Sequence, residues 1–123
     1  MRIATLIARI LLGLVFFVFG LNGFLHFIPN PPMSGPPADF FGELMATHYM
    51  IPLIFTAQVV GGILLLAGIF VPFALAVLAP VIVNIFFFHL FLAPDGLVIA
   101  TVVVVLELWL VWANRSKFAP LFS

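Results

Sequence analysis

Residues 51–92 read IPLIFTAQVVGGILLLAGIFVPFALAVLAPVIVNIFFFHLFL. The stretch contains no Asp, Glu, Lys or Arg. A membrane-spanning helix needs about 20 mainly apolar residues, so this stretch predicts two spans, at about 51–70 and 72–92. Only about one or two residues separate these spans, which makes the two helices antiparallel neighbours. A closed barrel would need strands of alternating polarity, and the stretch has none.

The composition extends this prediction to the whole chain. Of its 123 residues, 66% are hydrophobic and 7% are charged, whereas a soluble domain typically carries about 25% charged residues. Two further apolar stretches, at about 4–28 and 97–113, bring the number of predicted spans to four. We therefore predict an all-α integral membrane protein: an antiparallel four-transmembrane-helix bundle that forms a single domain, 1–123, and contacts membrane lipids.

Charge and cysteine content exclude several classes of function. The formal net charge is zero and there is no basic block, which argues against nucleic-acid binding. The chain has no Cys, which excludes disulfides, thiol redox chemistry and Cys-ligated metal centres.

The long connection at residues 29–50 begins with Pro29, Asn30, Pro31 and Pro32. Its second half, at about 37–49, predicts a short amphipathic helix that lies on the membrane surface over the mouth of the bundle. The alternative is an ordered loop without a helix. In the helical arrangement the apolar residues on one side are Phe40, Phe41, Leu44 and Met45. The polar residues assigned to this lid are Asp39, Glu43 and His48.

The distribution of charge predicts the orientation. With four spans, both termini lie on one side of the membrane. All four basic residues lie at or near the termini, whereas the loops of the other side carry acidic residues and no Lys or Arg. By the positive-inside rule, both termini are predicted to be cytoplasmic. The basic residues are Arg2, Arg9, Arg115 and Lys117, and the acidic residues of the outer loops are Asp39, Glu43 and Asp95.

Polar residues of the spans fall into two groups by depth, taking a rise of about 1.5 Å per residue. Arg9 and Glu107 lie at similar depth in the inner half, and their opposite charges predict an ion pair. The alternatives are that Arg9 extends alone to the inner surface and that Glu107 relays protons. The outer group consists of Asn22, His26, Gln58, Asn84 and His89. Polar groups in a membrane are costly unless paired, so these five are candidate ligand-binding residues. The alternatives are that they form hydrogen bonds between neighbouring helices or face lipid headgroups.

Several short motifs resemble a known family. They are ARILLG at residues 8–13, GLNG at 20–23, QVVGGILLLAG at 58–68, and Glu107 in the last span. The chain resembles the DoxX family of small four-helix bacterial membrane proteins. The resemblance implies a multi-pass protein of the bacterial cytoplasmic (inner) membrane. Several members are linked with redox systems, including a thiosulfate:quinone oxidoreductase subunit and a membrane-associated oxidoreductase complex. Members that work with thiols need cysteines, which this chain lacks.

Three functions fit these observations. The first is a redox-associated membrane subunit that binds a quinone or another lipophilic molecule in the outer polar pocket. The second is a non-enzymatic accessory subunit that packs against a larger membrane complex or against another copy of itself. The third is a metal site formed by His26, His89 and Glu43, because imidazole and carboxylate groups form a plausible ligand set.

Overall fold

The structure is a computed structural model and describes residues 2–27 and 34–122. In this part of the chain all regular elements are helical. Four segments are long and apolar enough to cross a membrane, which confirms the predicted all-α membrane bundle. They are α1 (Arg2–Leu25), α3 (Met50–Ala67), α4 (Val71–Phe91), and η1 (Pro94–Gly96) together with α5 (Leu97–Ala113). The predicted end of the first span at Ile28 and the turn residues 29–32 lie outside the described residues.

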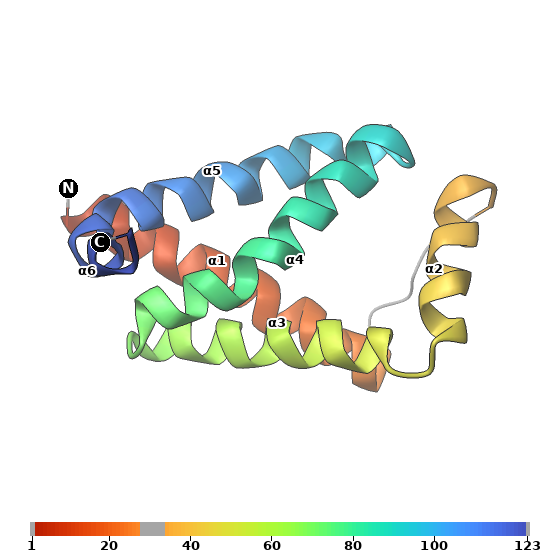
Figure 1. Cartoon of the computed structure of the whole chain (residues 1–123), viewed down its shortest axis with the longest axis horizontal. Helices are drawn as coiled ribbons and strands as arrows, with labels where there is room; N and C mark the ends of the chain where they lie inside the picture. Colours follow the sequence, from red (N-terminus) through yellow and green to blue (C-terminus); the bar gives the residue numbers. More distant parts are fainter. Residues whose placement is uncertain (1, 28–33, 123) are drawn as a thin grey trace.

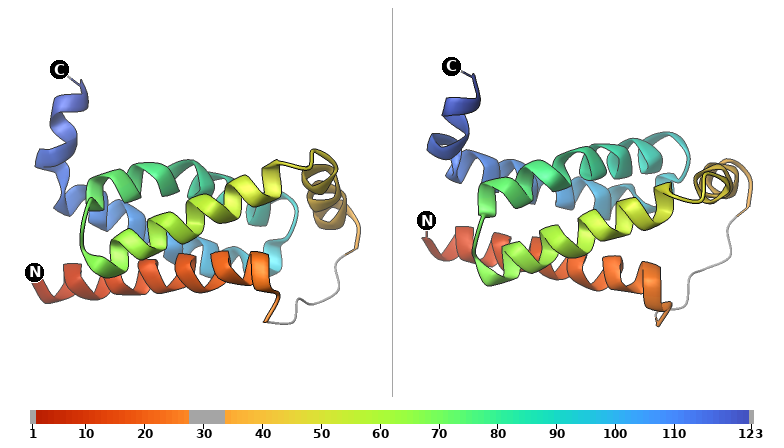
Figure 2. Two further views of the ribbon diagram at one scale, coloured as in Figure 1. Left: turned by 90° about the horizontal axis from the view of Figure 1, so that it is seen from below. Right: turned by 60° about the horizontal axis from the view of Figure 1, so that its bottom comes forward.

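The spanning helices run back and forth, so both ends of the described chain lie at one end of the bundle (Figure 1). At the opposite end, α2 (Pro36–Ala46) crosses over the mouth of the bundle (Figure 1). At the end with the termini, α6 (Arg115–Phe118) and η2 (Ala119–Phe122) turn away from the axis of α5 (Figure 2). The bundle therefore has two different ends, one with the termini and one covered by α2.

Glycines allow α1 and α3 to approach closely. A Cβ atom at Gly62 would lie 2.5 Å from the backbone nitrogen of Phe17 and 2.9 Å from the carbonyl oxygen of Gly13. A Cβ at Gly20 would lie 2.9 Å from a methyl carbon of Val59. Helices in lipid pack through such small residues because dispersion contacts replace the hydrophobic driving force. Gly13 and Gly20 of α1 both meet residues of α3, so this is the face along which the two helices approach closely.

The turn between α3 and α4 is one point where the structure differs from the predicted boundaries. α3 ends at Ala67, and the turn takes Gly68, Ile69 and Phe70. Gly68 has a φ of +75°, a left-handed conformation that favours glycine and ends helices. The N–H groups of Gly68 and Ile69 donate to the carbonyl of Leu64, at 2.9 and 3.2 Å. The span predicted at about 51–70 therefore ends three residues earlier, at Ala67.

The predicted helix of the outer loop is present as α2, but it ends at Ala46 rather than at about residue 49. Thr47 ends it, because its hydroxyl donates to the carbonyl of Leu44 at 2.7 Å. The same oxygen accepts the N–H of Met50 at 3.0 Å, which starts α3. His48, between them, has a φ of +66° and so cannot continue a helix.

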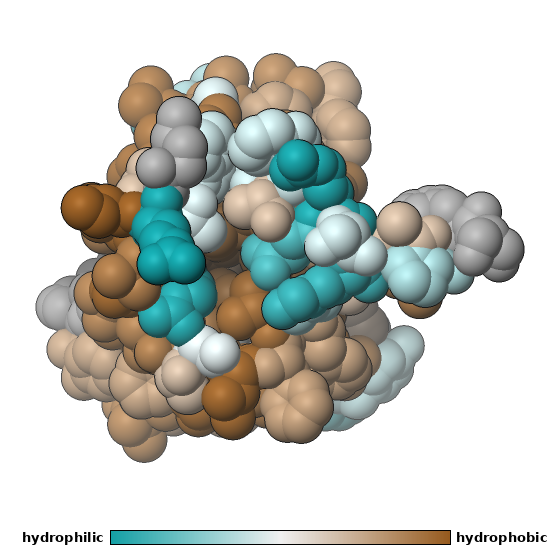
Figure 3. Space-filling model, turned by 90° about the vertical axis from the view of Figure 1, so that its left-hand side faces the viewer, coloured by the Kyte–Doolittle hydropathy of each residue, from teal (hydrophilic) through white to brown (hydrophobic). Residues whose placement is uncertain are grey.

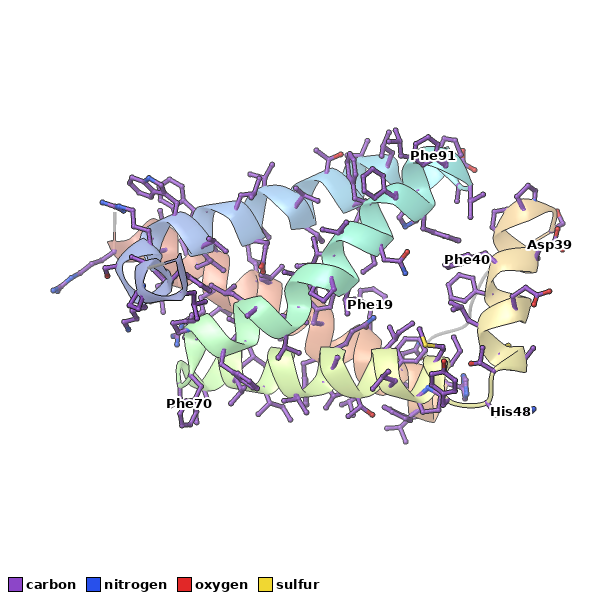
Figure 4. The ribbon with its side chains drawn as sticks, viewed as in Figure 1. Phe19, Asp39, Phe40, His48, Phe70 and Phe91 are labelled. Atoms are coloured by element: carbon purple, nitrogen blue, oxygen red, sulfur yellow. The ribbon has the colours of Figure 1, made fainter. Side chains whose placement is uncertain are left out.

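Aromatic contacts hold α2 against the bundle. The ring centroids of Phe40 and Phe41 lie 5.5 and 5.2 Å from that of Phe88 on α4, within the range of favourable aromatic pairs. In Figure 4, Phe40 points from α2 toward the bundle, whereas Asp39 and His48 lie on the sides that face away from it. The apolar face of α2 therefore faces the mouth of the bundle.

The core of the bundle is apolar, with large side chains that are entirely enclosed. The largest fully buried ones are Phe16, Leu12, Leu65, Leu75, Leu78 and Leu110. Large hydrophobic residues also cover the outside of all four spanning segments, which agrees with a surface covered by lipid.

Candidate functional site

An apolar cavity of about 460 Å³ lies between the spanning helices at the end covered by α2. Side chains from α1 to α5 form its wall, and only three of the twenty are polar. Phe19 of α1 and Phe40 of α2 lie on different sides of this space (Figure 4). Pro80 of α4 also lines it, and a proline inside a helix leaves one backbone carbonyl without its usual N–H partner. The cavity matches the common form of a small-molecule site: mostly apolar, with few converging polar groups.

The polar residues of the cavity are Gln58 of α3, and Asn84 and His89 of α4. Gln58 is buried, with 7% of its surface exposed. Within the described part of the chain, the side-chain amides of Gln58 and Asn84 form no hydrogen bond. Each amide has both donors and an acceptor, so both can bind a carbonyl or hydroxyl group that enters the cavity.

The imidazole of His89 is held by the turn that follows α4. Its Nδ1 lies 3.1 Å from the carbonyl oxygen of Ala93. Gly96 makes room for the ring, because a Cβ there would collide with the imidazole. Since a carbonyl only accepts hydrogen bonds, Nδ1 must be the donor, which makes Nε2 of the neutral ring an acceptor. This orientation leaves Nε2 free to accept a hydrogen bond from a ligand hydroxyl.

Two of the five predicted ligand-binding residues do not line this cavity. Asn22 is buried, with 6% of its surface exposed, but lies outside the wall. His26 is exposed just beyond the end of α1 and has a φ of +54°. Its N–H donates to the carbonyl of Asn22 at 2.8 Å, so the backbone of His26 serves to end α1. Because His26 has left the helical conformation, its side chain does not follow the helical spacing from Asn22.

The three polar lid residues are not part of the cavity, which agrees with the predicted division of this helix into an apolar and a polar side. Asp39, Glu43 and His48 are exposed and lie outside the cavity wall. The lid acts through its apolar face instead, with Phe40, Phe41 and Leu44 lining the cavity. Nothing in the polarity of these three aromatic and aliphatic residues distinguished them from lipid-facing ones, so the sequence could not assign them to a site.

The metal-site alternative is not supported. Over residues 2–27 and 34–122, no group of three or more His, Asp or Glu residues is close enough to hold a metal ion. His26 and Glu43 are both exposed and lie outside the wall of the cavity that His89 lines.

The predicted ion pair is not formed as a hydrogen-bonded contact. Glu107 is buried, with 6% of its surface exposed, and neither carboxylate oxygen has a hydrogen-bond partner among the described residues. The guanidinium of Arg9 lies against Gly68, which ends α3, where a Cβ atom would collide with it. The partial negative charge at the C-terminus of a helix favours a cation there, which explains why Arg9 turns toward α3.

The comparison with known proteins identifies the family. The DoxX family model matches residues 4–90, which cover nearly all of the first three spanning helices and exceed half of the chain. Glu107, one of the residues on which the resemblance rests, lies beyond this match. No curated protein and no solved structure matches the chain. The four spanning helices and the matched sequence together show that this chain belongs to the DoxX family.

Proposed function

We propose that the protein binds a quinone, or a similar lipophilic molecule, in the cavity beneath α2, as a redox-associated membrane subunit. The observation that carries the proposal is the apolar cavity of about 460 Å³ with three polar residues on two of its helices. Its volume falls in the range of about 300–1,000 Å³ that is typical of small-molecule sites. A quinone has a ring with polar substituents and an apolar tail, which matches a wall that is mainly apolar and has a few polar residues.

The polar groups suggest how such a ligand would be held. The amide N–H groups of Gln58 and Asn84 would donate to quinone carbonyls, and Nε2 of His89 would accept from the hydroxyl of the reduced form. The rings of Phe19 and Phe88 would contact the quinone ring, because aromatic rings favour offset or edge contacts.

Binding of a short-chain ubiquinone or menaquinone to the purified protein tests the proposal. Wild-type protein is expected to bind one of them saturably in equilibrium dialysis. Asn84→Leu is expected to weaken binding about tenfold, because a buried carbonyl left without a donor costs about 1–3 kcal/mol. His89→Ala is expected to have a similar effect on the reduced form.

His26→Ala is the matched control for His89→Ala, because His26 is exposed and lies outside the cavity wall. It is expected to leave the dissociation constant unchanged. Absence of saturable binding to wild-type protein, or equal losses in both histidine variants, would contradict the proposal.

We also propose that the termini face the cytoplasm of a bacterium and that α2 lies on the outer side of its inner membrane. All four basic residues lie near the termini, in agreement with the positive-inside rule. The chain has no native Cys, so single-cysteine labelling is clean. In intact cells whose outer membrane has been permeabilised, a membrane-impermeant maleimide is expected to label Ala46→Cys but not Ser116→Cys. Both positions are exposed. The reverse pattern would contradict this orientation.

Four glycines of α1 and α3, which could have formed a surface for a partner helix, pack inside the bundle instead. Gly13, Gly20 and Gly62 pack between α1 and α3, and Gly61 makes room for Leu78 of α4. A role as an accessory subunit therefore has no specific support from these glycines, and the cavity is the stronger basis for a function.

A further inference from the structure

A second cavity, of about 450 Å³, opens at the end of the bundle that carries the termini. Figure 3 views this end and shows hydrophilic side chains gathered there, with hydrophobic ones around them. The cavity lies between α1, α5 and α6. Its wall includes Arg2, Thr5, Arg9, Trp109, Trp112 and Arg115. The wall thus combines three arginines, of which Arg9 directs its guanidinium to Gly68, with two tryptophans.

Contacts between α1 and α5 build this wall. Arg2, Thr5 and Arg9 are spaced by three and four residues, so they share one face of α1. The indole N–H of Trp109 donates to the hydroxyl of Thr5 at 3.2 Å, which fixes α5 against this face. The rings of Trp109 and Trp112 lie next to each other, with centroids 5.6 Å apart.

Arg115 completes the wall from the start of α6. Its Nη1 donates to the carbonyl of Trp112 at 2.9 Å, and its Cζ lies 4.3 Å from the centre of the Trp112 ring. A guanidinium at this distance from an indole forms a cation–π contact. Arg has five N–H donors, so this arrangement orients the group and leaves donors available for a ligand.

The charge of this cavity has no counter-charge among the described side chains. Asp39, Glu43 and Asp95 lie at the opposite end of the bundle, on α2 and η1. Glu107 is buried, and its oxygens have no hydrogen-bond partner. The arginines can therefore bind an anion, and the planar guanidinium fits the oxygens of a phosphate group best.

We propose that this cavity binds the phosphodiester headgroup of an anionic phospholipid. Indole rings favour the level of the headgroups in a bilayer, and basic pockets between transmembrane helices bind anionic lipid headgroups. Arg2 and Arg115 would contact the phosphate, while the rings of Trp109 and Trp112 would lie against the glycerol and the first carbons of the acyl chains. The site is separate from the cavity beneath α2, and the proposal does not depend on a ligand there.

Tryptophan fluorescence tests this proposal, because the two tryptophans of the chain both line the cavity. Detergent-solubilised full-length protein is titrated with dioctanoyl phosphatidylglycerol, with dioctanoyl phosphatidylcholine and with inorganic phosphate. Only phosphatidylglycerol is expected to change the emission saturably. Arg2→Gln and Arg115→Gln are each expected to weaken its binding about fivefold, the usual contribution of one arginine to an anionic lipid surface.

Lys117→Gln is the matched control. Lys117 carries the same charge at the same end of the bundle but lies outside the cavity wall. It is expected to leave the affinity unchanged, whereas a general attraction to anionic lipid would be weakened equally by all three substitutions. Arg2 and Arg115 are exposed, so their variants should fold. If circular dichroism shows that Arg115→Gln does not fold, Arg2→Gln decides.

Three results would overturn the proposal. Equal binding of phosphatidylcholine would show that the acyl chains, and not the anionic headgroup, are recognised. Equal binding of inorganic phosphate would assign the cavity to a free anion instead of a lipid. An equal loss of affinity in Lys117→Gln would show that the net charge of this end is responsible.

Discussion

Gly62→Ala is expected to force α1 and α3 apart and to lower the free energy of unfolding by about 3 kcal/mol, the upper end of the typical cost of overpacking. The added methyl group would lie 2.5 Å from the backbone nitrogen and 2.8 Å from the Cα of Phe17. A side chain could rotate away from such a contact, but a helical backbone can yield only if the whole helix shifts. That shift would also disturb the packing of Leu12 and Leu65 in the core.

Gly42→Ala is the matched control for this prediction. Gly42 lies inside α2, and a Cβ atom there meets nothing within 4 Å. Alanine in a helix is favoured over glycine by about 0.8–1.0 kcal/mol, so this variant is expected to be as stable as wild type or slightly more stable. Unfolding by sodium dodecyl sulfate, monitored by circular dichroism, measures the stability of both variants. Equal midpoints for Gly62→Ala and wild type would show that α1 and α3 are not in close contact.

Glu107→Met is expected to raise the free energy of unfolding by about 1–3 kcal/mol, because an unpaired buried polar group costs about that much in proteins. Both carboxylate oxygens of Glu107 are buried without a hydrogen-bond partner in the described part of the chain. Its neighbours along the same face of α5, Val103 and Leu110, belong to the apolar core. An unbranched methionine of similar length keeps the packing and removes the polar group.

Glu107→Gln separates charge from polarity. The amide keeps two polar atoms in the same place, so Gln is expected to stabilise the protein less than Met does. The same detergent unfolding assay measures both variants. If Glu107→Met is less stable than wild type, the carboxyl group interacts favourably with a partner such as a bound ion or another subunit, and the residue then has a role beyond packing.

Part of the candidate site could be predicted from the sequence because depth in a membrane follows from position along the chain. Each residue of a helix rises about 1.5 Å, and the order of the spans alternates their direction. This arithmetic placed Gln58, Asn84 and His89 near the outer end, and all three line the cavity beneath α2. It could not place His26, because the left-handed conformation of this residue ends α1 and turns the side chain out of the helical pattern.

The direction of a side chain around its helix was a second source of difference. Arg9 and Glu107 have similar depth and opposite charge, which favoured an ion pair. In the structure, the space left by Gly68 draws the Arg9 guanidinium to the end of α3, while Glu107 stays inside the core. The amphipathic pattern of α2 was a better guide: α2 docks through the contacts of Phe40 and Phe41 with Phe88, while Asp39 and Glu43 remain exposed.

From the sequence one could predict the number of spanning helices, their alternating direction and the common end of the two termini. These follow from hydrophobicity, which acts locally along the chain through the cost of exposing polar groups to lipid. The positions of the cavities and the full set of side chains that line them became visible only in the folded bundle. Apolar residues such as Phe16, Phe19 and Ala100 line the cavity, but their hydrophobicity is the same as that of residues that face lipid. Their role depends on how the helices rotate and how closely they pack, which the glycines between α1 and α3 set through contacts far apart in the sequence.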